Sequence, residues 1–301
     1  MDIFLQQLLN GLTIGAVYAL IALGYTMVYG ILQMINFAHG EVFMAGAYFG
    51  LSVILAFGLA SPVPGGIAWL VGVICAAAAG CAVLGLLIER IAYRPLRKAP
   101  KLSVLITAIG VSFFLQNAVM LCWGAQDRYV PEMLPVRAMG EGGVAVSPMQ
   151  ATIFIVSLGL MVGLQWVVHG TKLGRGMRAV AQDPLAARLM GIPVDGVIAV
   201  TFAIGSALAG VGGVLFGVYY STINFHDGYL TGLKAFTAAV LGGIGNLPGA
   251  VLGGLLLGLL EGLGAGYISA QWKNVFAFTV LIGVLLLRPR GLLGEQISER
   301  A

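Results

Sequence analysis

Two similar stretches hold the side chains of this sequence that are best suited to chemistry. They read "INFAHGE" at residues 35–41 and "INFHDGY" at residues 223–229, and each follows a long apolar run. Their polar side chains are those of Asn36, His39, Glu41, Asn224, His226 and Asp227. Because such groups are costly against lipid, they usually face a cavity or a partner. We expect the asparagines to bond backbone groups freed at helix breaks, and the other four side chains to line a polar pathway. The alternative is that these residues lie at helix ends near the membrane surface.

The composition indicates an integral membrane protein. Of its 301 residues, 59% are hydrophobic and 9% are charged, against roughly 25% charged in a soluble domain. The net charge of +4 is small, which does not favour binding of nucleic acid. The three cysteines lie inside apolar runs without metal-ligand spacing, so no metal site is expected. Three scattered histidines without a Ser/His/Asp grouping argue against an enzyme.

Hydrophobic segments predict an all-α polytopic fold with about eight spans. A helix needs about 20 mainly apolar residues to cross a bilayer. Runs of suitable length occupy residues 8–30, 42–60, 66–88, 102–123, 149–168 and 196–222, followed by an interrupted run at 235–261 and a short one at 274–287.

Basic residues orient these spans. Residues 89–101, 169–195 and 288–301 carry five, four and three of the sixteen lysines and arginines. This distribution predicts that all three regions are cytoplasmic, and that the segment 124–148 is external. To end inside, the chain must cross the membrane an even number of times within the interrupted run 235–261.

That interrupted run contains "GGIGNLPGA" at residues 242–250. Pro248 removes a helix hydrogen bond, and the glycines beside Asn246 allow a turn. Irregular backbone at membrane depth survives only inside protein or along a watery cavity. We therefore expect a broken or re-entrant helix, buried near the membrane midplane and close to residues 35–41. A loop at the membrane surface is the alternative.

The two polar stretches also indicate an internal repeat. By the charge argument, the first copy begins on the inner side of the membrane and the second on the outer side. Inverted repeats with broken helices are typical of transporters, whose pathway lies at the repeat interface. We predict one transmembrane domain over residues 1–301, with halves at about 1–123 and 149–301.

The basic stretch 169–195 is predicted to contain a short amphipathic helix. Its defining residues are Asp183, Pro184, Leu185, Arg188, Leu189 and Gly191. The aspartate is a good N-cap, the proline suits the first helical position, and the glycine suits a C-terminal cap. The two leucines lie on an apolar edge, and the arginine extends toward water. We expect this helix to dock into a groove on a cytoplasmic partner. A helix lying on the bilayer surface is the alternative.

Four stretches resemble the branched-chain amino acid permeases of ABC importers, of the LivH type. They read "GYTMVYGILQMINFAHGEVFMAGAY", "IERIAYRPLR", "GRGMRAVAQDPLAARLMGI" and "KAFTAAVLGGIGNLPGAVLGGLLLG", and the likeness spans nearly the whole chain. The resemblance implies a permease subunit that carries leucine, isoleucine or valine across a bacterial inner membrane into the cytoplasm. It implies as partners a second, LivM-like permease, two cytoplasmic ATPase subunits and a periplasmic substrate-binding protein. It also implies that the helix beginning at Asp183 couples the ATPases to the permease.

The sequence agrees with this division of labour. It has no G-x-x-x-x-G-K-[ST] phosphate loop, so ATP and Mg²⁺ are expected on partner subunits and no cofactor on this chain. Permeases with similar motifs carry urea or short amides. A permease of a urea or short-amide importer is therefore the alternative. A secondary transporter driven by an ion gradient through Glu41 or Asp227, and a passive channel, are the remaining alternatives. Co-purification of ATPase subunits would separate both from an importer.

Overall fold

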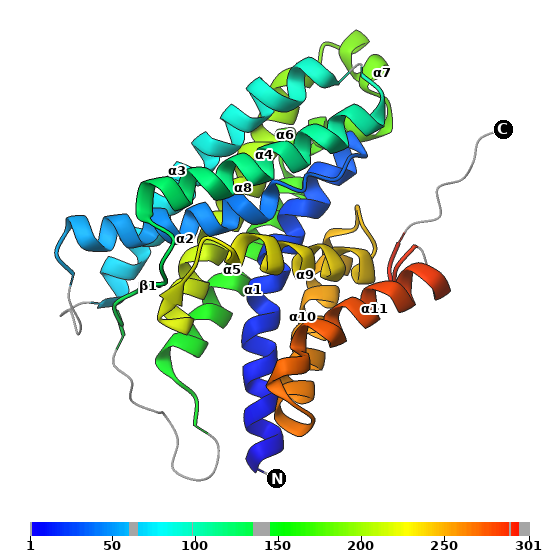
Figure 1. Cartoon of the computed structure of the whole chain (residues 1–301). Coiled ribbons are helices and arrows are strands. Elements are labelled where there is room, and N and C mark those ends of the chain that lie inside the picture. Colours follow the sequence, from blue (N-terminus) through cyan, green and yellow to red (C-terminus); the bar gives the residue numbers. More distant parts are fainter. Residues whose placement is uncertain (1, 60–65, 98, 135–144, 289, 295–301) are drawn as a thin grey trace.

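The computed structural model describes residues 2–59, 66–97, 99–134, 145–288 and 290–294, and these residues are almost entirely helical (Figure 1). The first half contains α1 (Asp2–Leu32), α2 (His39–Ala56), α3 (Gly66–Ile88) and α4 (Lys101–Trp123), with a π-helical turn (Glu89–Tyr93) and a 3₁₀ turn (Arg94–Leu96) after α3. The middle contains α5 (Pro148–Gly170), α6 (Lys172–Gln182) and α7 (Pro184–Leu189). The last part contains α8 (Val194–Tyr220), α9 (Asp227–Gly242), α10 (Leu247–Tyr267), a 3₁₀ turn (Ala270–Trp272) and α11 (Lys273–Leu287).

Eight helical segments of the described chain are long and apolar enough to cross a membrane, which confirms the predicted fold class. The interrupted run 235–261 forms two helices, α9 and α10. The chain turns between them at Gly243 and Gly245, whose φ angles of 107° and 99° favour glycine. Pro248 lies in the first turn of α10, where its missing N–H breaks no helical bond. Of these two helices, α10 is among the candidate spans and the 16-residue α9 is not, so the even number of crossings within this run stays a prediction.

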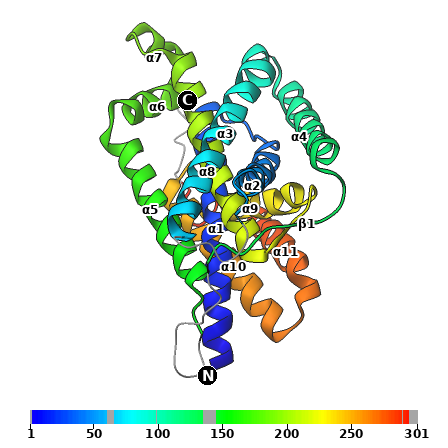
Figure 2. The ribbon, with the colours of Figure 1, turned by 90° about the vertical axis from the view of Figure 1, so that its left-hand side faces the viewer.

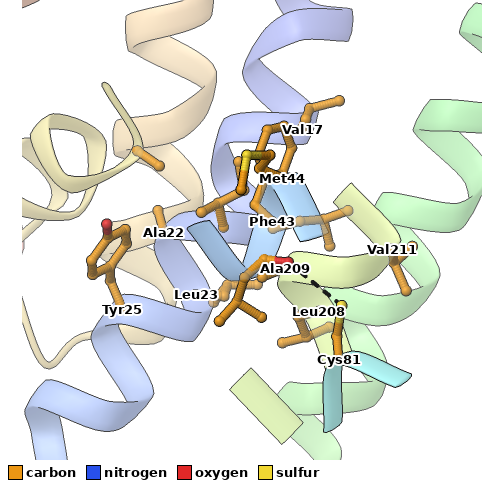
Figure 3. Packing of buried hydrophobic residues seen from close by; sticks show 14 of the residues in the cluster. Val17, Ala22, Leu23, Tyr25, Phe43, Met44, Cys81, Leu208, Ala209 and Val211 are labelled. Carbon is orange, nitrogen blue, oxygen red and sulfur yellow. Dashed lines mark hydrogen bonds between the residues drawn. The ribbon is translucent and has the colours of Figure 1, made fainter. Parts of the chain in front are cut away.

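The core lies where α1, α2 and α8 meet. Within their most apolar stretches, 83% of α1 and 72% each of α2 and α8 are buried, whereas only 6% of the last span is. Figure 3 shows side chains of these helices interleaved, with Phe43 and Met44 of α2 between residues of α1 and α8. The outer helices instead present apolar side chains outward, as expected of surfaces that face lipid or a partner subunit.

Glycines let the central helices approach closely. On α10, a Cβ added at Gly258 would lie 2.3 Å from the Cα of Gly15 on α1, and one at Gly254 would lie 2.6 Å from the Cα of Ala19. Gly262 meets Gly11 in the same way, so α1 and α10 run antiparallel along their length. Small residues at such contacts bring backbones together, which is how membrane helices gain packing energy.

The two halves of the fold show the same kind of helix pairing. As α10 packs antiparallel on α1, α3 packs antiparallel on α8, where a Cβ at Gly210 would lie 2.8 Å from that of Cys81 and one at Gly85 2.1 Å from Ser206 Oγ. α1 and α8 are themselves antiparallel, since Gly24 lies against Gly205 and Ile21 against Gly212. This correspondence relates α1–α4 to α8–α11. The predicted second half, residues 149–301, begins earlier and includes α5–α7, so that boundary stays a prediction.

Figure 2 shows α6 and α7, of the predicted inner segment 169–195, at the end of the bundle opposite the N-terminal end of α1. The N-terminal end of α1 contacts the start of α5, where Gln150 Nε2 donates to Asn10 Oδ1 at 2.9 Å. A short strand, β1 (Arg128–Tyr129), pairs antiparallel with β2 (Thr222–Ile223), which places the start of "INFHDGY" beside the segment 124–148. Residues 135–144 of that segment lie outside the described residues.

Candidate functional site

The two asparagine motifs adopt the same local structure. The Oδ1 atom of Asn36 accepts a hydrogen bond from the Ala38 N–H at 3.1 Å, and that of Asn224 accepts one from the His226 N–H at 2.9 Å. Each asparagine carbonyl also accepts from the N–H three residues later, at 3.1 Å in both copies. Each side chain therefore holds the turn that starts the next helix, α2 or α9, as expected for asparagine at a helix entry.

The turns before these helices repeat an unusual backbone conformation as well. Gln33 and Ser221 have φ angles of 51° and 57°, and they are the non-glycine residues of the described chain with positive φ. Both lie three residues before the asparagine of their motif. Left-handed backbone is disfavoured for residues with a Cβ, so its recurrence at matching positions is strong support for an internal repeat.

The two motifs meet at the centre of the fold. A Cβ added at Gly40 would lie 2.4 Å from the Gly228 carbonyl oxygen and 2.8 Å from the Cα of Gly232. One added at Gly228 would lie 2.8 Å from the Gly40 oxygen and 2.9 Å from the Cβ of Met44, so α2 and α9 cross in antiparallel fashion. Gly40 and Gly228 are equivalent positions of the two motifs. Residues that contact their own counterparts lie on the axis relating two halves, which supports a pathway at this crossing.

The first motif buries its ionisable side chains. His39 and Glu41 are each 1% exposed, so both are enclosed by protein. The His39 ring packs edge-on against Tyr25, with ring centroids 4.7 Å apart. The carboxylate of Glu41 accepts a hydrogen bond from the Ser112 hydroxyl of α4 at 3.2 Å through Oε1, while its Oε2 has no hydrogen-bond partner.

The second motif is more open and lies at the start of a helix. His226 is exposed, and its Nδ1 lies 2.8 Å from the Gln116 Nε2 of α4. Asp227 is half-buried at the start of α9, where its Oδ2 accepts from the Asn224 N–H at 2.7 Å. The Asn224 amide also donates to Asp127. These contacts fix the entry of α9.

A cavity of about 220 Å³ lies beside the crossing of α2 and α9. It is bounded by α1, α4, α9 and the segment before α2, and its lining includes Tyr25, Phe37, Ile109, Ser112, Phe113 and Gly228. Ser112 and Gly228 are also the residues that touch the two carboxylate oxygens of Glu41. The one acid of the first motif, Glu41, therefore lies directly behind the cavity wall.

The break between α9 and α10 is closed by a segment that the sequence analysis did not connect with it. Asn246 caps α10 by accepting from the Gly249 N–H at 2.9 Å, and its amide donates to the Leu293 carbonyl at 2.8 Å. The Leu292 and Leu293 N–H groups in turn bond carbonyls at the end of α9. The expected burial of this break is wrong, since Gly245 and Pro248 are exposed. Its expected closeness to residues 35–41 stays a prediction. Carbonyls freed at a helix end need donors, and residues 290–294 supply them.

The stretch 169–195 forms two helices, α6 and α7, where one was expected. Asp183 caps α7 through Oδ1, which accepts from the N–H groups of Leu185 and Ala186 at 2.8 and 3.0 Å. Pro184 lies at the first helical position, and Gly191 has a φ of 80° just beyond the end. Leu185 and Leu189 are 69% and 81% exposed. The predicted helix is thus present, and its apolar edge is uncovered.

A buried ion pair escaped the sequence analysis. Lys234 of α9 and Glu261 of α10 lie 2.9 Å apart, Nζ to Oε1, with side chains 10% and 2% exposed. The Tyr18 hydroxyl of α1 donates to Glu261 Oε2 at 2.9 Å. A lone lysine inside an apolar run was the available signal, because charges within spans are paired or functional.

A polar connection at the C-terminal end of α3 was also missed. The Tyr93 hydroxyl, on the π-helical turn, donates to Asn36 Oδ1 at 2.7 Å and so contacts the motif that starts α2. Four residues on, Arg97 pairs with Glu89 and with Asp195 at the start of α8. The segment after α3 therefore links the end of the α6–α7 region to the centre of the fold. Single-turn π-helices occur often at functional sites.

Comparison with known proteins identifies related permeases. A family described as branched-chain amino acid transport system / permease component matches residues 7–285. The chain is 50% identical to the high-affinity branched-chain amino acid transport system permease protein BraD of Pseudomonas aeruginosa, covering 99% of this chain and 98% of that one. It is 47% identical to LivH of Escherichia coli, described in the same words, covering 99% and 97%. It is also 30% identical to the autoinducer 2 import system permease protein LsrC of Klebsiella pneumoniae, over 58% of this chain and 52% of that one.

The chain therefore belongs to the branched-chain amino acid transport permease family, and it is a multi-pass membrane protein.

Proposed function

We propose that this chain is a permease subunit of an ATP-driven importer that carries leucine, isoleucine and valine across the bacterial inner membrane into the cytoplasm. A second, homologous permease completes the pathway, two cytoplasmic ATPase subunits supply the energy, and a periplasmic binding protein delivers the substrate. ATP and Mg²⁺ are bound by the ATPases, and this chain binds no cofactor.

The observation that carries the proposal is the 50% identity to a permease of this kind over 99% of the chain. The fold is compatible with it, because two helices, α2 and α9, cross at a contact of equivalent glycines in the manner of an inverted-repeat transporter. Apolar faces on the outer helices leave surface for a second permease.

The helix α7 is the proposed point of contact with the ATPases. Its cap fixes the N-terminal turn, and Ala187, which is 4% exposed, anchors it to the rest of the chain. Leu185, Leu189 and Met190 project from it with exposures of 69%, 81% and 82%. An apolar edge on a short helix is suited to insertion into a hydrophobic groove.

Uptake measurements test the function. In bacteria that lack other importers for these amino acids, this chain should restore uptake of radiolabelled leucine only when its companion subunits are present. Leucine, isoleucine and valine should compete with one another, and urea and acetamide should not compete. Competition by urea, or uptake that continues without any ATPase subunit, would each contradict the proposal.

The coupling helix is tested by Leu189→Asp. A carboxylate without a partner in a dry interface costs several kcal/mol, so the variant should reach the membrane normally but lose the ATPases or fail to couple hydrolysis to uptake. Asp183→Ala should be milder, at about 1 kcal/mol. Pull-down of the ATPases, paired with uptake, gives the readout. Normal recruitment together with normal uptake in Leu189→Asp would exclude this role for α7.

A further inference from the structure

The buried carboxylate of Glu41 has one oxygen that the fold leaves without a partner. Glu41 is 1% exposed, its Oε1 accepts from Ser112, and its Oε2 accepts from no donor. Buried polar atoms are nearly always hydrogen-bonded, and an exception calls for an explanation. The residue beside Oε2 is a glycine, Gly228, and any larger residue there would place its Cβ 2.4 Å from this atom.

The contrast with another buried carboxylate, that of Glu261, is informative. Glu261 is equally buried, but its Oε1 lies 2.9 Å from Lys234 Nζ in an ion pair, and its Oε2 accepts a hydrogen bond from the Tyr18 hydroxyl. A carboxylate that serves only the fold is therefore paired within this chain. Glu41 has no such cation among its described contacts, and a cavity lies on the other side of the two residues that touch it.

The cavity has the chemistry of an amphipathic site. Phe37, Ile109 and Phe113 give it aromatic and aliphatic walls, and Ser112 adds a hydroxyl group to them. The first turn of α9 also lines it, at Gly228 and Tyr229. The first N–H groups of a helix have no intrahelical acceptor and favour an anion.

The size of the cavity suits a small amino acid. Its volume is about 220 Å³, whereas an apolar cavity of about 150 Å³ holds a benzene molecule. An ion buried in such a place needs a partner of opposite charge, and an α-ammonium group would provide one for Glu41.

We propose that this cavity is a substrate site of the permease, in which Glu41 and Ser112 hold the α-ammonium group of a branched-chain amino acid. The first turn of α9 holds the α-carboxylate, and the side chain lies against Phe37, Ile109 and Phe113. The ammonium reaches Glu41 when α2 and α9 move apart at the contact between Gly40 and Gly228. This inference rests on the proposed function and assigns the recognition to this subunit.

Photo-crosslinking tests the location without any substitution. The full importer, with its ATPases and binding protein in lipid nanodiscs, is exposed to a diazirine analogue of leucine during turnover. Labelled peptides should include residues 109–113 and 228–233, and excess leucine should abolish the labelling. Leucine uptake with labelling confined to other segments would overturn the site but leave the proposed function intact. Absence of leucine uptake by the wild-type importer would instead overturn the proposed function.

Substitution tests the role of the carboxylate. Glu41→Gln should lower leucine uptake at least about tenfold, because a hydrogen bond to a charged group is lost, while the unfolding temperature stays the same or rises since an unpaired buried charge is removed. Ser112→Ala should lower uptake less. Ser157→Ala, which removes another buried hydroxyl on α5 that has no partner, should leave uptake unchanged.

These variants separate recognition from a structural role. If Glu41 served only the fold, Glu41→Gln would transport leucine like the wild type, or would lose uptake and thermal stability together. Either outcome contradicts the assignment.

Discussion

The ion pair between Lys234 and Glu261 makes a quantitative prediction about stability. The two charges lie 2.9 Å apart with side chains 10% and 2% exposed, and the Tyr18 hydroxyl satisfies the second carboxylate oxygen. Changing Lys234 to Met keeps an unbranched side chain but leaves the Glu261 carboxylate buried without a cation. Breaking a buried pair from one side costs about 3–5 kcal/mol.

This cost predicts a measurable fall in unfolding temperature. At roughly 2–3 °C per kcal/mol for a chain of this size, Lys234→Met should lower Tm by roughly 6–15 °C. The double variant Lys234→Met with Glu261→Gln removes both charges and should recover most of that loss, because an amide is far less costly to bury than a carboxylate. Tyr18→Phe should cost only about 1 kcal/mol, since one hydrogen bond is lost.

A buried cysteine provides the assay. Cys81 is fully buried, whereas Cys75 and Cys122 are exposed. In a background with both exposed cysteines changed to serine, a thiol-reactive fluorophore reports unfolding of the detergent-solubilised protein through Cys81 alone. If Lys234→Met melts like the parent, or if the double variant is less stable than either single variant, the pair does not stabilise the fold as argued.

Three further outcomes are expected. Gly228→Ala should destabilise the protein by about 1–3 kcal/mol, since its Cβ would lie 2.4 Å from Glu41 Oε2, whereas Gly159→Ala, with nothing within 4 Å, should be nearly neutral in the same melting assay. Tyr93→Phe removes the hydrogen bond to Asn36 and should cost about 0.5–1.5 kcal/mol; a Tm equal to that of the parent would show that this bond does not hold the start of α2. A single cysteine at Glu141 should react with an impermeant reagent added from outside, and one at Lys172 should not. Labelling at Lys172 alone would reverse the predicted topology.

Local features of the sequence determined the elements of this protein. Apolar runs predicted the spans because each span must satisfy its own backbone and cover its length with apolar side chains. The cap at Asp183 was readable because N-capping depends on neighbours only a few residues away. The likeness of residues 35–41 to residues 223–229 predicted a repeat for the same reason, since the asparagine turns are local structures.

Tertiary structure decided which of these elements meet. The pairing of Lys234 with Glu261, the contact of Tyr93 with Asn36, and the closure of the α9–α10 break by residues 290–294 all join segments far apart in the chain. Sequence analysis could say that the backbone groups freed at that break need partners, but not that residues 290–294 supply them. The cavity behind Glu41 arises in the same way. Its walls come from four separate parts of the chain, and only their packing shows that one carboxylate oxygen is left free.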